Sequence, residues 1–137
     1  MMTKARVSIT ISSTSPDHRI KQSVTGELYR RDDQWIIRYA EPEGQMGRTM
    51  TTVKCEPGQI RIIRHGDVES EQTFQLHKRL RGTYQTVQGT LPIESKTHAM
   101  KMNMREQQGS IAWTYDLFVT GEFAGKYQLR LDVVEEQ

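Results

Sequence analysis

The feature that most constrains the fold is a period of two in the apolar residues, which recurs along most of the sequence. It is clearest between Ile111 and Val119, where Trp113, Tyr115 and Leu117 take every second position. A β-strand points alternate side chains to opposite faces, so this pattern predicts a strand with one buried face. No stretch has a convincing period of 3.6 residues, and the sequence therefore predicts an all-β fold.

The same alternation, divided by turn signals, predicts about ten short strands. Pro57-Gly58 and Gly66-Asp67 are typical of tight hairpin connections. A sixth strand is expected to bury Phe74 and Leu76, and two more are expected in 80–100, joined at Gln88-Gly89. The other expected strands lie at about 6–12, 20–29, 34–39, 48–56, 60–63, 111–119 and 127–133.

A single domain over residues 1–137 suits a chain of this length, and 35% hydrophobic residues suit a sheet that is buried on one face. Strands joined by hairpins predict an up-and-down antiparallel β-barrel of about eight to ten strands, which closes on itself and leaves no free edge. A β-sandwich is the alternative. Gly26, within a strand pattern, predicts a bulge or a sharp bend.

The residues after Gly89 contain a change of parity. Leu91 and Ile93 are at odd positions, whereas Met100 and Met102 are at even positions of the same run. One extra residue between 94 and 99 would bring both pairs to one face, so we expect a β-bulge there, or a strand that changes which side it buries. Pro92 cannot donate a backbone hydrogen bond and is expected at an edge or an irregularity.

Several classes of protein are disfavoured by what the sequence lacks. Cys55 is the only cysteine, so an intramolecular disulfide is impossible. The first residues contain no apolar signal core, and no run of about eighteen apolar residues occurs, so we expect a soluble cytoplasmic protein without a membrane partner. Neither a metal-ligand spacing nor a nucleophile or phosphate-loop motif is present, and we expect no metal, no cofactor and no enzymatic activity.

Three motifs give the sequence a family resemblance. They are the run Arg81-Gly82-x-Tyr84-x-Thr86-x-x-Gly89-x-Leu91-x-Ile93, the stretch Thr51-Thr52-Val53-Lys54, and the run Ile111-x-x-x-Tyr115-x-Leu117. In these the chain resembles a family of small bacterial proteins of unassigned function, DUF1934 or the YwiB-like proteins. The resemblance covers nearly the whole chain and implies a fold similar to the calycins, the lipocalin-like barrels. It implies no catalytic residues.

A barrel of this size either fills with side chains or holds one small ligand. The favoured function is therefore non-enzymatic binding of a small, partly apolar ligand inside the barrel. Polar groups for its mouth are expected from the basic, hydroxyl-rich segment 80–100, namely Arg81, Tyr84, Thr86 and Thr97. Aromatic and thioether side chains that would line the interior, or simply form its core, are Trp35, Tyr39, Trp113, Tyr115, Met100 and Met102.

Charge distribution supports a competing function. The net charge is only +2, but residues 74–105 contain six basic residues and one acid. A basic surface with an aromatic ring could bind nucleic acid or a protein partner. The residues of this alternative are Arg61, Arg64, Lys78, Arg79, Lys96 and Lys101. Whether the protein is a monomer or a homodimer stays open.

Overall fold

The computed structural model describes residues 2–42, 44 and 46–136. These residues form ten β-strands and no helix, so a helix long and apolar enough to cross a membrane does not occur in them. The strands are β1 (Met2–Thr14), β2 (Arg19–Arg31), β3 (Gln34–Ala40), β4 (Thr49–Glu56), β5 (Gln59–Gly66), β6 (Glu69–Phe74), β7 (Arg79–Thr86), β8 (Gly89–Arg105), β9 (Gln108–Val119) and β10 (Glu122–Glu135).

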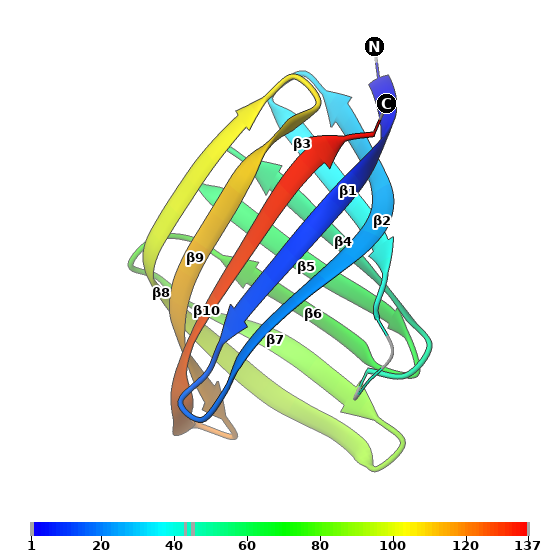
Figure 1. Cartoon of the computed structure of the whole chain (residues 1–137). Helices are drawn as coiled ribbons and strands as arrows, with labels where there is room; N and C mark the ends of the chain where they lie inside the picture. The colour runs from blue at the N-terminus through cyan, green and yellow to red at the C-terminus, as the bar shows by residue number, and fades with distance from the viewer. Residues whose placement is uncertain (1, 43, 45, 137) are drawn as a thin grey trace.

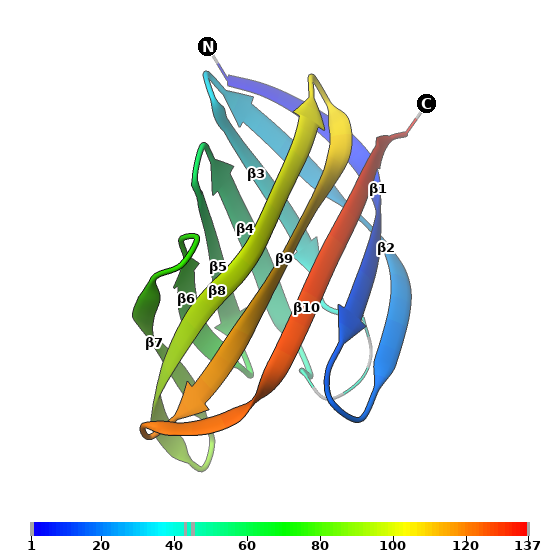
Figure 2. The ribbon, with the colours of Figure 1, turned by 90° about the vertical axis from the view of Figure 1, so that its left-hand side faces the viewer.

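The strands form one closed antiparallel barrel (Figures 1 and 2). Each strand pairs with the next along the chain, and β10 returns to pair with β1 from Val7–Glu135 to Thr14–Gln128. The predicted all-β up-and-down barrel is thus confirmed, and the sandwich alternative is wrong. Both termini lie at one end of the barrel, the upper end in Figure 1.

The register confirms the predicted bulge in the long strand β8. Thr97 lies opposite Tyr115 of β9, whereas Ala99 lies opposite Thr114, so His98 is the extra residue.

Pro92 lies just before the β8–β9 ladder begins at Ile93. Its carbonyl accepts a hydrogen bond from Thr120 N at 3.0 Å beyond that ladder. Because the N and O of one strand residue face the same side, the missing N–H of Pro92 interrupts no ladder bond.

The predicted hairpin at Pro57-Gly58 is confirmed, with Gly58 at a positive φ of 78° between β4 and β5. The prediction for the sixth strand is wrong in one respect, because Leu76 is 44% exposed rather than buried. The strand ends at Phe74, and the following segment crosses to β8, where Leu76 forms an isolated bridge with Thr97. His77 N also donates a hydrogen bond to Thr97 O at 2.8 Å. Because the segment crosses to β8 here, Leu76 no longer follows the alternation of β6.

The middle of the barrel is filled with apolar side chains. Phe74 packs against Trp113 and Tyr115, with ring centroids 5.5 and 4.7 Å apart. Fully burying one such large apolar side chain contributes about 1.5–3 kcal/mol to folding. The largest fully buried side chains are Trp113, Phe74, Ile9, Leu28, Ile37, Ile60, Ile62, Ile111, Leu131, Val7, Val53 and Val133.

The barrel is less regular at the end opposite the termini. β2 pairs with β1 along its whole length but with β3 only from Gly26 to Arg31. At Gly26 the two strands approach so closely that a Cβ atom would lie 2.5 Å from the Arg38 carbonyl oxygen. Tyr39 lies directly opposite, and its Cβ atom would be 3.1 Å from a Cβ atom at Gly26. Residues 19–25 therefore have no β3 partner among the described residues, and the barrel is open beside them.

Candidate functional site

A row of inward-facing polar side chains crosses five adjacent strands near this open end. The register pairs each residue directly with the next, from β3 to β7. We call this set the polar row: Tyr39, Thr51, Arg64, Ser70 and Tyr84. Directly paired residues have Cβ atoms about 4.5–5.5 Å apart, so these side chains form one continuous band of hydroxyl groups around a single guanidinium.

Arg64 lies at the centre of the polar row and faces an acid. Its Nε atom is 3.8 Å from Glu41 Oε2, and only 12% and 11% of the two side chains are exposed. That distance suits an ion pair but is too long for a hydrogen bond. Thr51 Oγ1 donates to the same carboxylate. Arg64 Nε and Ser70 Oγ are buried without a hydrogen-bond partner in the described part of the chain.

The hydroxyl groups near Arg64 are neutral donors at physiological pH. Burial, reinforced by the Glu41 carboxylate, raises the pKa of Tyr39 well above its usual range. Burial also raises the pKa of Tyr115 to about 12, although the nearby Arg64 charge acts in the opposite direction. Arginine stays charged at any pH that the fold tolerates. The site therefore combines one fixed cation, one carboxylate and several protonated hydroxyls.

A cavity of about 290 Å³ lies beside Arg64, between β1, β2, β5, β10 and the segment that follows β3. Aliphatic side chains form one part of its wall, and polar groups form another. The aliphatic lining is Ile11, Ile20, Ile62, Leu129 and Leu131, and the polar lining is Ser13, Gln22, Tyr39, Glu41 and Arg64. Such a cavity can hold a molecule that is apolar at one end and polar at the other.

The four residues expected at the mouth are not brought together. Arg81 is exposed on β7, whereas Thr97 is fully buried in the interior with its hydroxyl unpartnered among the described residues. Tyr84 is half-buried and belongs to the polar row. Thr86 ends β7, and its side chain lies outside what the structure describes. Arg81 and Thr97 cannot contact one ligand group, because they lie on opposite faces of the sheet.

The aromatic and methionine residues expected in the interior are found there, mostly as packed core. Tyr39, Trp113 and Tyr115 are 3%, 1% and 6% exposed. The others, Trp35, Met100 and Met102, are partly buried and pack against the same core. Of these six side chains, Tyr39 alone lines the cavity at Arg64. The interior is thus filled in the middle and open at one end.

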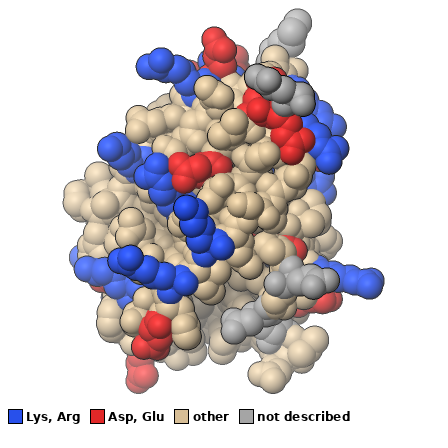
Figure 3. Space-filling view, in the orientation of Figure 1, with Lys and Arg blue, Asp and Glu red and all other residues tan. Residues whose placement is uncertain are grey.

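The basic residues of the alternative function are divided between the interior, which Arg64 faces, and the outer face, where Arg79 and Lys96 are direct cross-strand partners. Arg64 faces the interior, Arg61 pairs with Glu71, and Arg79 pairs with Glu94 at 3.0 Å while its guanidinium lies 3.7 Å from the Phe118 ring centre. The three lysines of this set, at positions 78, 96 and 101, are exposed. On the face shown in Figure 3, basic groups are separated by acidic and uncharged side chains rather than forming a stripe.

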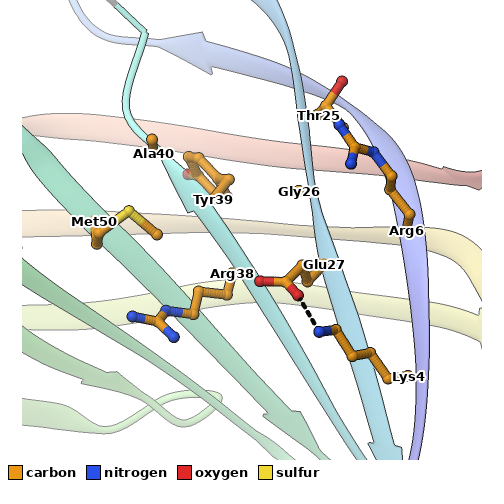
Figure 4. Close-up of a pocket in the computed structure, with 9 residues that line it drawn as sticks. All are labelled: Lys4, Arg6, Thr25, Gly26, Glu27, Arg38, Tyr39, Ala40 and Met50. Carbon is orange, nitrogen blue, oxygen red and sulfur yellow. Dashed lines mark ion pairs between the residues drawn. The ribbon is translucent and has the colours of Figure 1, made fainter.

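A second hollow, of about 450 Å³, lies on the outer surface around Gly26 (Figure 4). Arg38 lines it without an ion pair among the described residues, whereas two other pairs of charged groups are formed: Arg6 with Glu136 at 3.1 Å, and Lys4 with Glu27 at 2.7 Å. This pairing raises the pKa of Lys4 and lowers the pKa of Glu27. No lining residue of this hollow has a buried polar atom that lacks a partner in the described structure, so it is a weaker candidate than the cavity at Arg64. Among the described residues, no three His, Cys, Asp or Glu side chains converge as a metal site.

The sequence contained a signal for Arg64 that its charge obscured. Ile60, Ile62 and Arg64 share one parity in β5, and the two isoleucines are buried. Continuing that alternation places Arg64 inside the barrel. No comparable signal marks Glu41, which follows the end of β3 and reaches Arg64 through the fold.

Comparisons with known proteins agree with this architecture. The model of the family described as "Domain of unknown function (DUF1934)" matches residues 6–131. The chain is similar to the uncharacterized beta-barrel protein YwiB of Bacillus subtilis (strain 168), with 27% identity over 103 residues, which are 75% of this chain and 72% of that protein. The crystal structure of the B. subtilis ywiB protein matches with a TM-score of 0.88 at 21% identity, over 99% of this chain and 96% of that one. The finer likeness to lipocalin-like barrels stays a prediction.

Proposed function

This chain belongs to the DUF1934 family of domains of unknown function, and we propose that it binds a small, partly apolar molecule in the cavity beside Arg64. One observation carries the proposal: the buried Nε of Arg64 has no hydrogen-bond partner among the described residues and lies at a cavity with an aliphatic wall. The function is binding without chemistry.

Two energetic terms favour occupancy of this cavity. A buried donor without an acceptor costs about 1–3 kcal/mol, and a ligand oxygen at Arg64 would recover that free energy. Each methylene group of the ligand that leaves water for the aliphatic wall adds about 0.8 kcal/mol. The ligand is therefore amphiphilic, with its polar end at Arg64 and its apolar end toward Leu129 and Leu131.

The volume limits the size of the ligand. At about 30 Å³ for each water molecule, a cavity of about 290 Å³ holds on the order of ten waters. This lies at the lower limit of ligand pockets in proteins. A molecule of about ten non-hydrogen atoms fits this volume.

The composition of the cavity favours binding over catalysis. Its described lining contains no histidine or cysteine, and its one carboxylate, Glu41, is engaged by Thr51 and Arg64. A general base needs a free acceptor within reach of the proton that it removes. We therefore propose no reaction for this site.

Native mass spectrometry of gently purified protein, compared with the denatured sample, tests the proposal. We expect a bound small molecule in the wild type, and its loss in Leu129→Trp, which fills the cavity. Val134→Trp is the matched control, because Val134 is on the same strand but 57% exposed. Retention of the molecule by Leu129→Trp would place it elsewhere. An empty wild type that also binds no small amphiphile at millimolar concentration would contradict the proposal.

A further inference from the structure

Building on the proposed function, we infer that the polar end of the ligand is a carboxylate, and that Glu41 takes its place at Arg64 and Thr51 when the cavity is empty. The inference names a ligand class, singly charged carboxylic acids with a short apolar chain. It also gives Glu41 a role as an internal competitor for the same donors.

The donors around Arg64 suit an oxyanion. Thr51 and Ser70 are the direct cross-strand neighbours of Arg64, one on each side. Three adjacent side chains therefore offer a hydroxyl, a guanidinium and a second hydroxyl, which match oxygen atoms that accept several hydrogen bonds. Thr51 already donates to a carboxylate, that of Glu41.

Glu41 satisfies this set of donors only in part. Its Oε2 atom is 3.8 Å from Arg64 Nε, whereas charge-assisted hydrogen bonds between these groups are about 2.7–2.9 Å long. Arg64 Nε and Ser70 Oγ have no hydrogen-bond partner in the described residues. Arg64 lines the cavity, so a ligand carboxylate that is free to orient can approach its guanidinium more closely than the tethered Glu41 does.

The Glu41 side chain can leave without unfolding the barrel. Its backbone N–H donates to Thr49 O at 2.8 Å, which holds the main chain against β4. Glu41 is among the residues that line the cavity, and 11% of its side chain is exposed. Rotation about the side-chain bonds therefore moves the carboxylate out while the strands stay paired.

The charges favour a carboxylate over a phosphate. Arg64 is the one cation among the described residues that line the cavity. A doubly charged phosphate would be desolvated beside a single arginine, with Glu41 still nearby, and its second charge would stay unpaired. A monoanion with an aliphatic chain balances Arg64 and uses the aliphatic wall.

Isothermal titration with octanoate and 1-octanol tests the inference, because the two probes share a chain and differ in the head group. We expect Arg64→Gln to weaken octanoate binding about tenfold or more and to change octanol binding less than about twofold. We expect Glu41→Gln to strengthen octanoate binding about tenfold, since the competing carboxylate is gone. The matched controls are Arg61→Gln and Glu71→Gln, which change an ion pair on the outer face of the neighbouring strands β5 and β6.

The outcomes separate this inference from the proposed function. Octanol binding that equals octanoate binding and ignores both substitutions would overturn the carboxylate inference and leave the proposed function standing. Absence of octanoate binding to the wild type and to Glu41→Gln would also overturn the inference. The proposed function is tested separately, by native mass spectrometry. If Glu41→Gln does not fold, Glu41→Asp withdraws the carboxylate by one methylene and should likewise strengthen octanoate binding.

Discussion

Arg64 and Ser70 are direct cross-strand partners on β5 and β6, and each has a buried polar atom without a hydrogen-bond partner in the described structure. Most buried polar groups in proteins are hydrogen-bonded, so two unpaired atoms on adjacent residues are unusual. Each costs about 1–3 kcal/mol of stability. Of the two residues, Arg64 lines the cavity, so the barrel places part of this cost beside its candidate ligand site.

The ion pair of Arg64 and Glu41 should be strongly non-additive. We expect Arg64→Met to lower the free energy of unfolding by about 3 kcal/mol, because it leaves the Glu41 carboxylate nearly buried and unpaired. In the double variant Arg64→Met, Glu41→Met we expect stability within about 1 kcal/mol of the wild type, since neither charge is left behind. Urea unfolding of the three variants measures this, and equal, additive losses would contradict it.

Trp113 should behave as packed core. It is 1% exposed and its ring lies 5.5 Å from that of Phe74. Trp113→Ala should therefore lower the free energy of unfolding by about 3–5 kcal/mol. A thermal or urea unfolding curve gives the value. Val134→Ala, at an exposed site on β10, is the control and should change stability by less than about 0.5 kcal/mol. A loss at Trp113 as small as this would show that its surroundings are loose.

Gly26 should tolerate no side chain. A Cβ atom there would be 2.5 Å from Arg38 O and 2.7 Å from Ile9 Cδ1, so the strands must separate to admit it. We expect Gly26→Ala to lower the free energy of unfolding by about 1–3 kcal/mol. The neighbouring Thr25→Ala, which removes atoms from the outer face, is the comparison. Chemical denaturation of both variants decides the point, and equal stabilities would contradict the close approach.

The free energy of unfolding should decrease at alkaline pH, because two buried groups keep their protons in the folded protein. Burial raises the pKa of the Cys55 thiol from 9.0 to about 12 and that of the Tyr115 hydroxyl from 10.0 to about 12. Between pH 9 and 12 the unfolded chain therefore loses protons that the folded protein keeps, and the free energy of unfolding falls as pH rises. One such group contributes a slope that approaches about 1.4 kcal/mol per pH unit.

Urea unfolding between pH 8 and 11 measures this slope in the wild type, Cys55→Val and Tyr115→Phe. We expect the decline of Cys55→Val to begin about one pH unit later, since tyrosines then titrate first. Tyr115→Phe should reduce the slope above pH 10 and leave it unchanged below. Identical slopes in all three proteins would show that neither group stays protonated in the folded state.

Local patterns were sufficient for much of the architecture. Alternation located the strands, and the change of parity between Ile93 and Met100 located the bulge that the register places at His98. These features are readable because each depends on neighbours along the chain. The prediction failed at Leu76, where a contact with Thr97 of another strand overrides the local pattern.

The sequence by itself determined an all-β barrel, its approximate strands and the inward face of most of them, because a period of two is a local property of the chain. Only the tertiary structure decided where a site could form. The register across five strands aligns Tyr39, Thr51, Arg64, Ser70 and Tyr84, and the folding of the segment after β3 brings Glu41 to Arg64. Turn signals predict which strands are neighbours, but the register that aligns these five side chains and the fold that brings Glu41 to Arg64 depend on strand pairing and barrel closure, which the alternation does not fix.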